Sequence, residues 1–213
     1  EHEDALVEVQ GRISRVLPGV DQTARVKTIQ TLHDKLRRQS TRLSRVHDII
    51  GVRLVLDIGL REQDGIVGTL VGEFPGARLI DRRARPSFGY RAVHVIVQVG
   101  RCHCEVQVRT EPQHLWAEIV ERLGDRWGRG IRYGEPPPDP QRDLGGLTRQ
   151  ELWDLVQEVG ELTHELESEA QGGGVREGSR EPGTDSEAVR LARRQVRQML
   201  DRLLKLLERD VAL

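Results

Sequence analysis

Cysteines and long apolar runs are scarce in this 213-residue chain. The only two cysteines, Cys102 and Cys104, are too close together in an extended strand for a good disulfide, and nothing indicates an oxidising compartment. No stretch approaches the roughly 18 apolar residues of a membrane span, and the segment 1–4 is charged, unlike a signal peptide. We therefore expect a soluble, cytoplasmic protein with no membrane partner.

An excess of charge of one sign is also missing. The chain has 33 basic and 34 acidic residues, which argues against a coat protein or a membrane binder that acts through bulk charge. Lysine is rare among the basic residues, which are otherwise arginines: Lys27, Lys35 and Lys205 are the only ones. Two of these three lysines, Lys27 and Lys35, lie within nine residues of each other.

Periodicity predicts the elements of the first half of the chain. Val26, Ile29, Leu32 and Leu36 recur at helical spacing, and Lys27, Lys35 and Arg38 would then form a basic face opposite that stripe. The predicted elements are helices over 3–17, 24–38 and 60–74, strands over 49–57 and 77–81, and a loop over 81–89.

A β-hairpin is the clearest local prediction. Strands over 93–99 and 102–109 flank Gly100-Arg101, a pair suited to a two-residue turn. If Val99 pairs with Cys102, alternation places the valines and cysteines on a core face. The other face carries His94 across from Gln107, with Glu105 one diagonal step away. Alternation also separates His103 from the two cysteines, which disfavours a metal site at Cys102-His103-Cys104.

Helices are predicted for the rest of the chain. Thr110 to Gln113 reads as a capping box before a helix whose apolar stripe runs through Trp116, Ile119, Leu123 and Trp127. Glycines and prolines mark a boundary near 135, and a Gly/Ser/Glu-rich joint over 171–185 is expected to be disordered. Two heptad-like stripes lie on either side of this joint: Leu152, Leu155, Val159, Leu162 and Leu166, then Val189, Ala192, Val196, Met199, Leu203 and Leu206.

These last two helices have opposite charge. Residues 151–170 hold seven acids and no base, whereas 187–209 hold seven bases and three acids. Such helices should pair within one chain or between subunits. They would form an intramolecular hairpin, a homo-oligomer interface or a docking surface for an antitoxin protein.

Two carboxylates and the basic segment together indicate phosphoryl chemistry. Asp48 precedes the strand over 49–57, and Glu105 lies on the polar face of the hairpin. Mg²⁺ takes hard oxygen ligands and is commonly held by one or two carboxylates plus substrate phosphates, whose charge basic residues would neutralise. Simpler roles compete with this interpretation: Asp48 as a strand cap, Glu105 as a solvated side chain and the basic helix face as an ordinary wet surface.

Six segments in order resemble the synthetase domain of the RelA/SpoT family, over about residues 20–134. They are Arg25-x-Lys27, Lys35-x-x-Arg38, Asp48 to Arg53, Gly89-Tyr90-Arg91-Ala92-Val93-His94, Glu105 to Thr110 and Trp116-Ala117. The resemblance implies an α+β fold, a mixed β-sheet flanked by helices as in nucleotidyltransferase-like synthetases, with a C-terminal helical extension. It also implies an ATP-dependent pyrophosphokinase that transfers the β,γ-pyrophosphate of ATP to a ribose 3′-hydroxyl. The corresponding organisation is an N-terminal helix (1–20), a synthetase domain (21–135) and a C-terminal helical hairpin (145–213).

The resemblance assigns roles to individual residues. The ATP-binding residues would be Arg25, Lys27, Lys35 and Arg38. Asp48 and Glu105 would bind Mg²⁺ and act in catalysis, and Glu105 would help to deprotonate the attacking hydroxyl. The acceptor side would be Tyr90, stacked on a base, with His94 and Gln107. Arg53 and Arg109 are as well explained by structural salt bridges as by substrate contact, and Arg91 is expected to be solvated.

The sequence departs from the family at the acceptor loop. The usual Lys-Pro-Asn-Gly-Tyr is Pro86-Ser87-Phe88-Gly89-Tyr90 here, and the Glu-His pair that commonly follows the family's Trp is replaced by Val120-Glu121. In these two places the sequence is more similar to the toxic small alarmone synthetases, which modify the 3′-terminal adenosine of tRNA. Three arginines are candidates for RNA binding: Arg82, Arg83 and Arg85. The alternatives are (p)ppGpp synthesis from GDP or GTP, and a catalytically inactive nucleotide-binding or regulatory module.

Overall fold

The computed structural model describes residues 1–27, 32, 37, 49–137, 146–172 and 187–209. Asp48, Lys35 and Arg38, and the joint predicted over 171–185 from residue 173 onward, lie outside these ranges. The chain divides into two compact units. The first unit comprises residues 1–57, 62–82 and 92–109, and the second comprises 58–61, 83–91 and 110–213. The predicted synthetase domain, 21–135, therefore contains residues of both.

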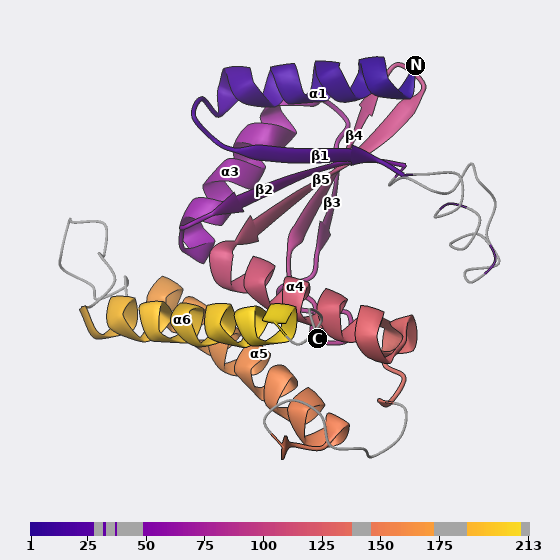
Figure 1. Ribbon diagram of the computed structural model, residues 1–213. Helices are drawn as coiled ribbons and strands as arrows, with labels where there is room; N and C mark the ends of the chain where they lie inside the picture. The colour runs from indigo at the N-terminus through magenta and orange to yellow at the C-terminus, as the bar shows by residue number, and fades with distance from the viewer. Residues whose placement is uncertain (28–31, 33–36, 38–48, 138–145, 173–186, 210–213) are drawn as a thin grey trace. The chain divides into compact units, whose positions relative to one another are not determined.

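The first unit is built around a five-stranded sheet (Figure 1). Its strands are β1 (Gln22–Val26), β2 (Ile50–Leu56), β3 (Arg78–Asp81), β4 (Val93–Val99) and β5 (Cys102–Thr110). Their order across the sheet is β1-β2-β5-β4-β3, and the pairs β1/β2, β4/β5 and β3/β4 are antiparallel. The sheet is mixed and has helices beside it, which confirms the predicted α+β class.

Two helices cover one face of this sheet. Alternating residues of β2, β4 and β5 point to that face and are buried, mostly valines. Helix α1 (His2–Val16) places Val9 and Ile13 against them, and α3 (Leu60–Glu73) contributes Leu70. Because side chains in a strand alternate, the neighbouring residues of each strand must point to the opposite face. That opposite face holds the polar residues that the sequence singles out.

The prediction of a helix over 24–38 is wrong for its first residues. Residues Gln22–Val26 are strand β1, which pairs with β2 so that Arg25 lies opposite Gly51. The Lys27 backbone N–H extends this pairing by donating to the Ile49 carbonyl over 2.8 Å. The apolar stripe suggested a helix, but hydrogen bonds to a strand more than 20 residues away decide the conformation of this short segment.

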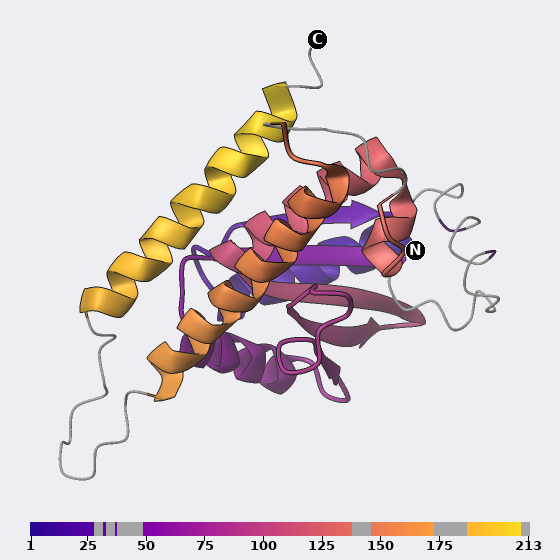
Figure 2. The same ribbon diagram turned by 90° about the horizontal axis from the view of Figure 1, so that it is seen from below.

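The second unit is mainly helical. It contains α4 (Glu111–Trp127), the short 3₁₀ helix η2 (Arg129–Tyr133), α5 (Arg149–Gly172) and α6 (Glu187–Arg209). The capping box is confirmed: the Thr110 hydroxyl accepts from the Gln113 backbone N–H, and the Gln113 side chain accepts from the Thr110 N–H. All four residues of the predicted apolar stripe of α4 are buried. Helices α4, α5 and α6 pack against one another, and α5 and α6 lie side by side (Figure 2).

The heptad stripe predicted for α5 is partly wrong. Leu152 and Val159 are buried as expected, but Leu155 and Leu162 are exposed. Thr163 and Glu167 are buried in their place, because this side of α5 faces a tryptophan and a polar helix end. In α6, Met199 is likewise exposed, whereas Leu200 and Leu207 are buried.

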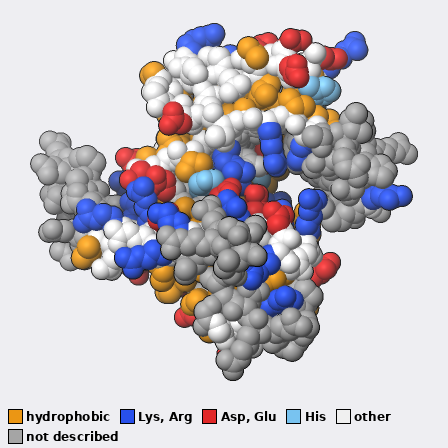
Figure 3. Space-filling view, in the orientation of Figure 1, with side chains coloured by type: hydrophobic (Ala, Val, Ile, Leu, Met, Phe, Trp, Pro, Cys, Tyr) orange, Lys and Arg blue, Asp and Glu red, His pale blue; other side chains and the backbone are white. Residues whose placement is uncertain are grey.

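Basic side chains gather along α6, as Figure 3 shows. They include Arg193, whose guanidinium donates to the Ile58 carbonyl, and Arg197, which lies 2.6 Å from the Glu111 carboxylate. Within the described ranges, no helix has both the length and the apolar character needed to cross a bilayer.

Candidate active site

The β4–β5 hairpin has the predicted register. Val99 pairs with Cys102, and His94 pairs with Gln107. The turn residue Gly100 has a φ of 56°, a left-handed conformation that glycine adopts at little cost. Cys102 and Cys104 face the core, and burial raises the pKa of the Cys104 thiol to about 12. This thiol is therefore protonated at neutral pH and is not a nucleophile.

Glu105 is the centre of a polar network on the opposite face. The residue is only 9% exposed. Its Oε1 atom lies 2.9 Å from Nδ1 of His94 and accepts a hydrogen bond of 2.7 Å from Nε2 of Gln107. A buried carboxylate is costly unless it is paired, and these two partners hold one of its oxygens in a defined position. Three predicted site residues are thus brought together within one hairpin.

Arg109 extends this network along β5. It is 3% exposed, and its guanidinium donates to Oε1 of Gln107 over 2.9 Å. The guanidinium and the carboxylate of Glu105 therefore orient the Gln107 amide from its two ends. Arg109 thus contacts the predicted site through Gln107. The period of two in Glu105-x-Gln107-x-Arg109 is the signal by which sequence reasoning finds this row.

Two of the four residues predicted to bind ATP, Arg25 and Lys27, lie within the described ranges. Arg25 is exposed on β1 and lies opposite Gly51, and Gly51 is adjacent to Glu105 on the neighbouring strand β5. Strands are about 4.8 Å apart, so Arg25 and Glu105 start from backbone positions about 10 Å apart on one face. Gly51 places no side chain between them. Lys27 is two residues beyond Arg25 and half-buried.

No grouping of three His, Cys, Asp or Glu side chains suited to a metal ion occurs in the described part of the chain. Glu105 is the one predicted magnesium ligand that falls within those ranges, and its supposed partner Asp48 is outside them. The network around Glu105 is nonetheless compatible with an oxygen-ligated cation, because it supplies a fixed carboxylate.

The loop predicted to bind the acceptor lies within residues 83–91 of the second unit, here called the acceptor loop, and folds around a tight turn. Ser87 and Tyr90 exchange two backbone hydrogen bonds of 3.1 and 3.2 Å, and the residues between them both have positive φ, 54° at Phe88 and 85° at Gly89. This is the backbone of a type I′ turn, in which Asn-Gly is the favoured pair. A left-handed phenylalanine costs about 1–2 kcal/mol, so the turn holds Phe88 under strain.

Trp116 of α4 contacts both this loop and α5. Its indole N–H donates to the Val156 carbonyl over 2.8 Å, and the ring is buried between Gly89 and Gly160. A Cβ at Gly89 would lie 2.7 Å from the ring, and one at Gly160 would lie 2.6 Å from its nitrogen. Both glycines are therefore needed for this close approach.

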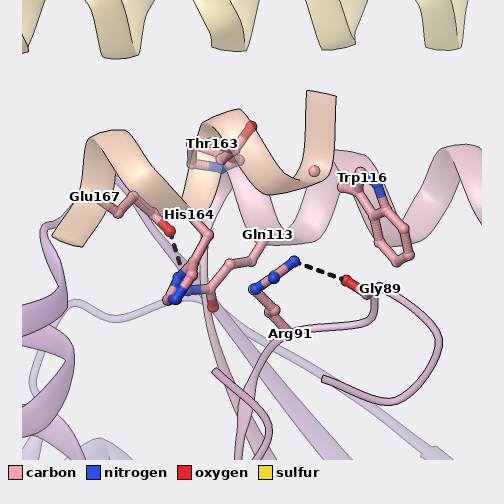
Figure 4. Close-up of a pocket in the computed structure, with 9 residues that line it drawn as sticks. Gly89, Arg91, Gln113, Trp116, Thr163, His164 and Glu167 are labelled. Carbon is pink, nitrogen blue, oxygen red and sulfur yellow. Dashed lines mark hydrogen bonds between the residues drawn. The ribbon is translucent and has the colours of Figure 1, made fainter. Parts of the chain in front are cut away.

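Arg91 makes a second connection to α5, which corrects the expectation that it is solvated. Its side chain is buried and lies 2.8 Å from the Glu161 carboxylate. It also donates to the Gly89 carbonyl, as Figure 4 shows. The cavity drawn in that figure has a volume of about 10 Å³, which is no larger than a water molecule needs. The side chains around it are therefore closely packed.

Glu167 of α5 is a residue that sequence reasoning missed. It is 2% exposed, and its carboxylate accepts from the Thr110 hydroxyl over 2.6 Å and from the Gln113 amide over 3.3 Å. Burial raises the pKa of this carboxyl, against the opposing effect of those hydrogen bonds and of Arg193 and Arg83. Glu167 thus fixes the start of α4, directly after β5. No pattern marks it among the other acids of α5.

A larger pocket lies beside the acceptor loop, with a volume of about 220 Å³. The residues that line it are Ser87, Phe88, Tyr90, Trp116, Ala117, Val120, Glu121, Arg132 and Tyr133. Tyr90, the predicted base-stacking residue, is half-buried here. Of the arginines predicted to bind RNA, Arg85 is exposed in the same loop, whereas Arg82 and Arg83 are half-buried.

Comparison with known sequences places this arrangement in a family. Residues 24–123 match the family model described as the region found in RelA / SpoT proteins. An uncharacterized protein of Mycobacterium tuberculosis is 36% identical over 185 residues, which are 80% of this chain and 68% of that protein. A probable chloroplastic GTP diphosphokinase of Arabidopsis thaliana is 36% identical over 102 residues, which are 45% of this chain and 14% of that protein.

Solved structures share the fold. The small alarmone synthetase 2 of Bacillus subtilis has a TM-score of 0.59 at 22% identity, over 80% of this chain and 93% of that one. A GTP pyrophosphokinase family protein of Streptococcus pneumoniae has a TM-score of 0.56 at 20% identity, over 80% and 91% of the two chains. From the sequence matches and this common fold, we conclude that the chain belongs to the RelA/SpoT family.

Proposed function

We propose that this RelA/SpoT-family ATP-dependent pyrophosphokinase transfers the β,γ-pyrophosphate of ATP to the 3′-hydroxyl of the terminal adenosine of tRNA. Such a modification would block aminoacylation of the tRNA in the cytoplasm, so the protein would act as a translation-inhibiting toxin. The observation that carries the catalytic part is the buried Glu105 carboxylate, held by His94 and Gln107 on one face of the hairpin.

The reaction requires positioning and charge neutralisation more than covalent catalysis. The ribose 3′-oxygen forms a bond to the β-phosphorus of ATP, the bond from that phosphorus to the α,β-bridging oxygen breaks, and AMP leaves. The Glu105 carboxylate accepts the proton of the attacking hydroxyl. His94 and Gln107 orient the carboxylate, and Arg109 acts as a positioning residue through Gln107.

Basic residues would hold the triphosphate. Arg25 is exposed on the same sheet face as Glu105, and Lys27 follows it in the chain. Lys35 and Arg38, outside the described ranges, complete the set by family resemblance. A lysine is a compact point charge, whereas arginine presents a planar fork, so the two retained lysines suit individual phosphate oxygens.

Magnesium fits the donor chemistry of this face. Glu105 provides a fixed hard oxygen ligand, and Asp48 would provide the second carboxylate. The ion would offset the negative charge of the ATP phosphates when bound. The protein's own part is to hold the Glu105 carboxylate on the sheet face opposite the core, which also carries Arg25.

The acceptor assignment rests on the loop around Tyr90. Its ring would stack on the acceptor base, and the exposed Arg85 would contact the RNA backbone. GDP or GTP is the second candidate acceptor, because relatives 35–36% identical over about half of this chain are named probable GTP diphosphokinases.

A toxin of this kind would need an antitoxin partner, and the C-terminal helices offer a surface for one. Leu155 and Leu162 of α5 and Leu191 and Met199 of α6 are apolar and exposed. The same side chains suit an interface with a second copy of the chain, which sedimentation of the purified protein would detect.

The acceptor is tested with ATP labelled in its β- and γ-phosphates. The purified protein is offered GDP, GTP, ATP or bulk tRNA separately, with and without Mg²⁺. We expect label on tRNA that disappears when the tRNA 3′ end is oxidised with periodate or when Mg²⁺ is removed. Label on GDP or GTP alone would contradict the tRNA assignment, and label on none of the four would favour an inactive nucleotide-binding module.

A further inference from the structure

Aromatic residues are concentrated in one pocket of the second unit. The whole chain has three Trp, two Tyr and two Phe. Both tyrosines, Phe88 and Trp116 line the 220 Å³ pocket. Trp116 is buried and serves the packing of α5, but Phe88 is 53% exposed and Tyr133 is 42% exposed. Exposed rings gathered at one concave place, in a chain with so few of them, indicate a site for a flat ligand.

The position of Phe88 is maintained at an energetic cost. It occupies a left-handed backbone position for which asparagine or glycine is suited. Its ring packs over Gly134, where any Cβ would overlap the ring atoms, and Gly134 itself has a φ of 83°. Strain that the surrounding structure retains is a reason to look for a function of the side chain.

Tyr133 follows a residue that is anchored to α4. It ends η2, and the preceding residue, Arg132, anchors that turn to α4 by donating to the Glu121 carbonyl and to Asp125 over 2.7 Å. Gly124 makes room for this anchor, because a Cβ there would collide with the Arg132 side chain. Arg132 therefore anchors the backbone that carries Tyr133, which reduces the conformational freedom that this turn would lose on binding.

We propose that Phe88 and Tyr133 form a second base-binding platform, which receives the nucleotide that precedes the acceptor nucleotide in a single-stranded RNA end. The inference rests on the proposed function, in which Tyr90 stacks on the acceptor base. One mononucleotide has one base and would leave the outer rings uncovered, whereas two successive bases of a strand would cover both platforms. Aromatic platforms stack any base, and Arg85 in the same loop suits the phosphate between the nucleotides.

Binding is measured without any transfer step. The probe is a single-stranded RNA trinucleotide ending in adenosine, with a 5′ fluorescein label, and the readout is fluorescence anisotropy, with unlabelled trinucleotide and AMP as competitors. We expect the trinucleotide to compete far better than AMP. Phe88→Asn and Tyr133→Ser should each weaken trinucleotide binding by about 5- to 100-fold, the loss of one stacked base. Phe88→Tyr and Tyr133→Phe keep the rings and should bind within about twofold of the wild type.

Misfolding is excluded by the choice of variant. Phe88→Asn places a residue suited to the turn, so its melting temperature should equal or exceed that of the wild type. Unchanged trinucleotide binding by Phe88→Asn and Tyr133→Ser, or equal competition by AMP and the trinucleotide, would overturn the platform. Because anisotropy needs no catalysis, a failure of pyrophosphate transfer would contradict the proposed function and leave this test intact.

Discussion

The β4–β5 hairpin and the acceptor pocket are built in different ways. Glu105, Gln107 and Arg109 alternate along one strand, and His94 comes from the strand paired with it, so a segment of 16 residues contains the whole network. The acceptor pocket combines residues from 87 to 133, and residues of α5 hold its loop and its tryptophan in place. The network proposed for catalysis thus depends on local register, whereas the pocket proposed for the acceptor depends on packing between distant segments.

The comparison predicts that the largest effect on activity comes from the hairpin. Glu105→Gln removes the proposed proton acceptor and should lower kcat by about 10²- to 10⁴-fold without disturbing the register of the strands. The rate is measured as labelled pyrophosphate transferred per minute. Gln98→Ala, on the exposed end of the same face, is the matched control and should keep the wild-type rate. Equal rates for Glu105→Gln and Gln98→Ala would remove Glu105 from the catalytic centre.

The next effect should appear in the stability of the second unit. Gly160→Ala would bring a Cβ within 2.6 Å of the Trp116 nitrogen, and such overpacking costs about 1–3 kcal/mol. Gly65→Ala is the control in α3, because Gly65 is also a helical glycine but, unlike the buried Gly160, is exposed and has nothing within 4 Å. It should stabilise the protein by about 0.5–1 kcal/mol. Urea unfolding of both variants gives the signs, and a stabilising Gly160→Ala would contradict the packing described for Trp116.

A smaller effect is expected from the ion pair between Arg91 and Glu161. The Glu161 side chain is 57% exposed, so solvent screens the pair and its coupling energy should be about 0.5–1 kcal/mol. A double-mutant cycle with Arg91→Met and Glu161→Gln, followed by urea unfolding, isolates this energy. Strictly additive effects would mean that Trp116 and the glycines hold the acceptor loop without help from the pair.

The smallest predicted effect is a change in the pH dependence of stability. The folded protein raises the pKa of Glu167 above its ordinary value of 4.5, chiefly by burial. A raised carboxyl pKa contributes stability at low pH, and this contribution is lost as the pH rises through the folded pKa. The wild type should therefore lose stability relative to Glu167→Gln as the pH increases from 4.5 toward neutral. Parallel curves of unfolding free energy against pH would contradict the assignment.

The sequence predicts the parts of this molecule that depend on local periodicity. Alternation and the Gly100-Arg101 turn suffice for the register of the hairpin, and the capping box marks the start of α4. These local signals fail where pairing with a strand distant in the sequence decides the conformation. The strand at Gln22–Val26 depends on β2, and its apolar residues also fit a helical stripe.

The interior face of α5 could not be predicted for a similar reason. Gly160, Thr163 and Glu167 are not apolar, yet they face the partners that need them: the Trp116 indole and the capped end of α4. Exposed Leu155 and Leu162 fit a heptad better than the residues that are buried. Contacts made by hydrogen bonds and by small side chains produce no periodic pattern of hydrophobic residues. The contacts that hold the acceptor loop can therefore be found only in the structure.

The central claim is that the polar face of the β4–β5 hairpin catalyses transfer of pyrophosphate from ATP to a ribose hydroxyl. The most direct test is the identity of the nucleotide released. ATP labelled in the adenine ring is incubated with the protein and bulk tRNA, in parallel with ATP labelled in its β- and γ-phosphates. The account predicts one AMP released for each pyrophosphate that appears on tRNA. Release of ADP in place of AMP would contradict it.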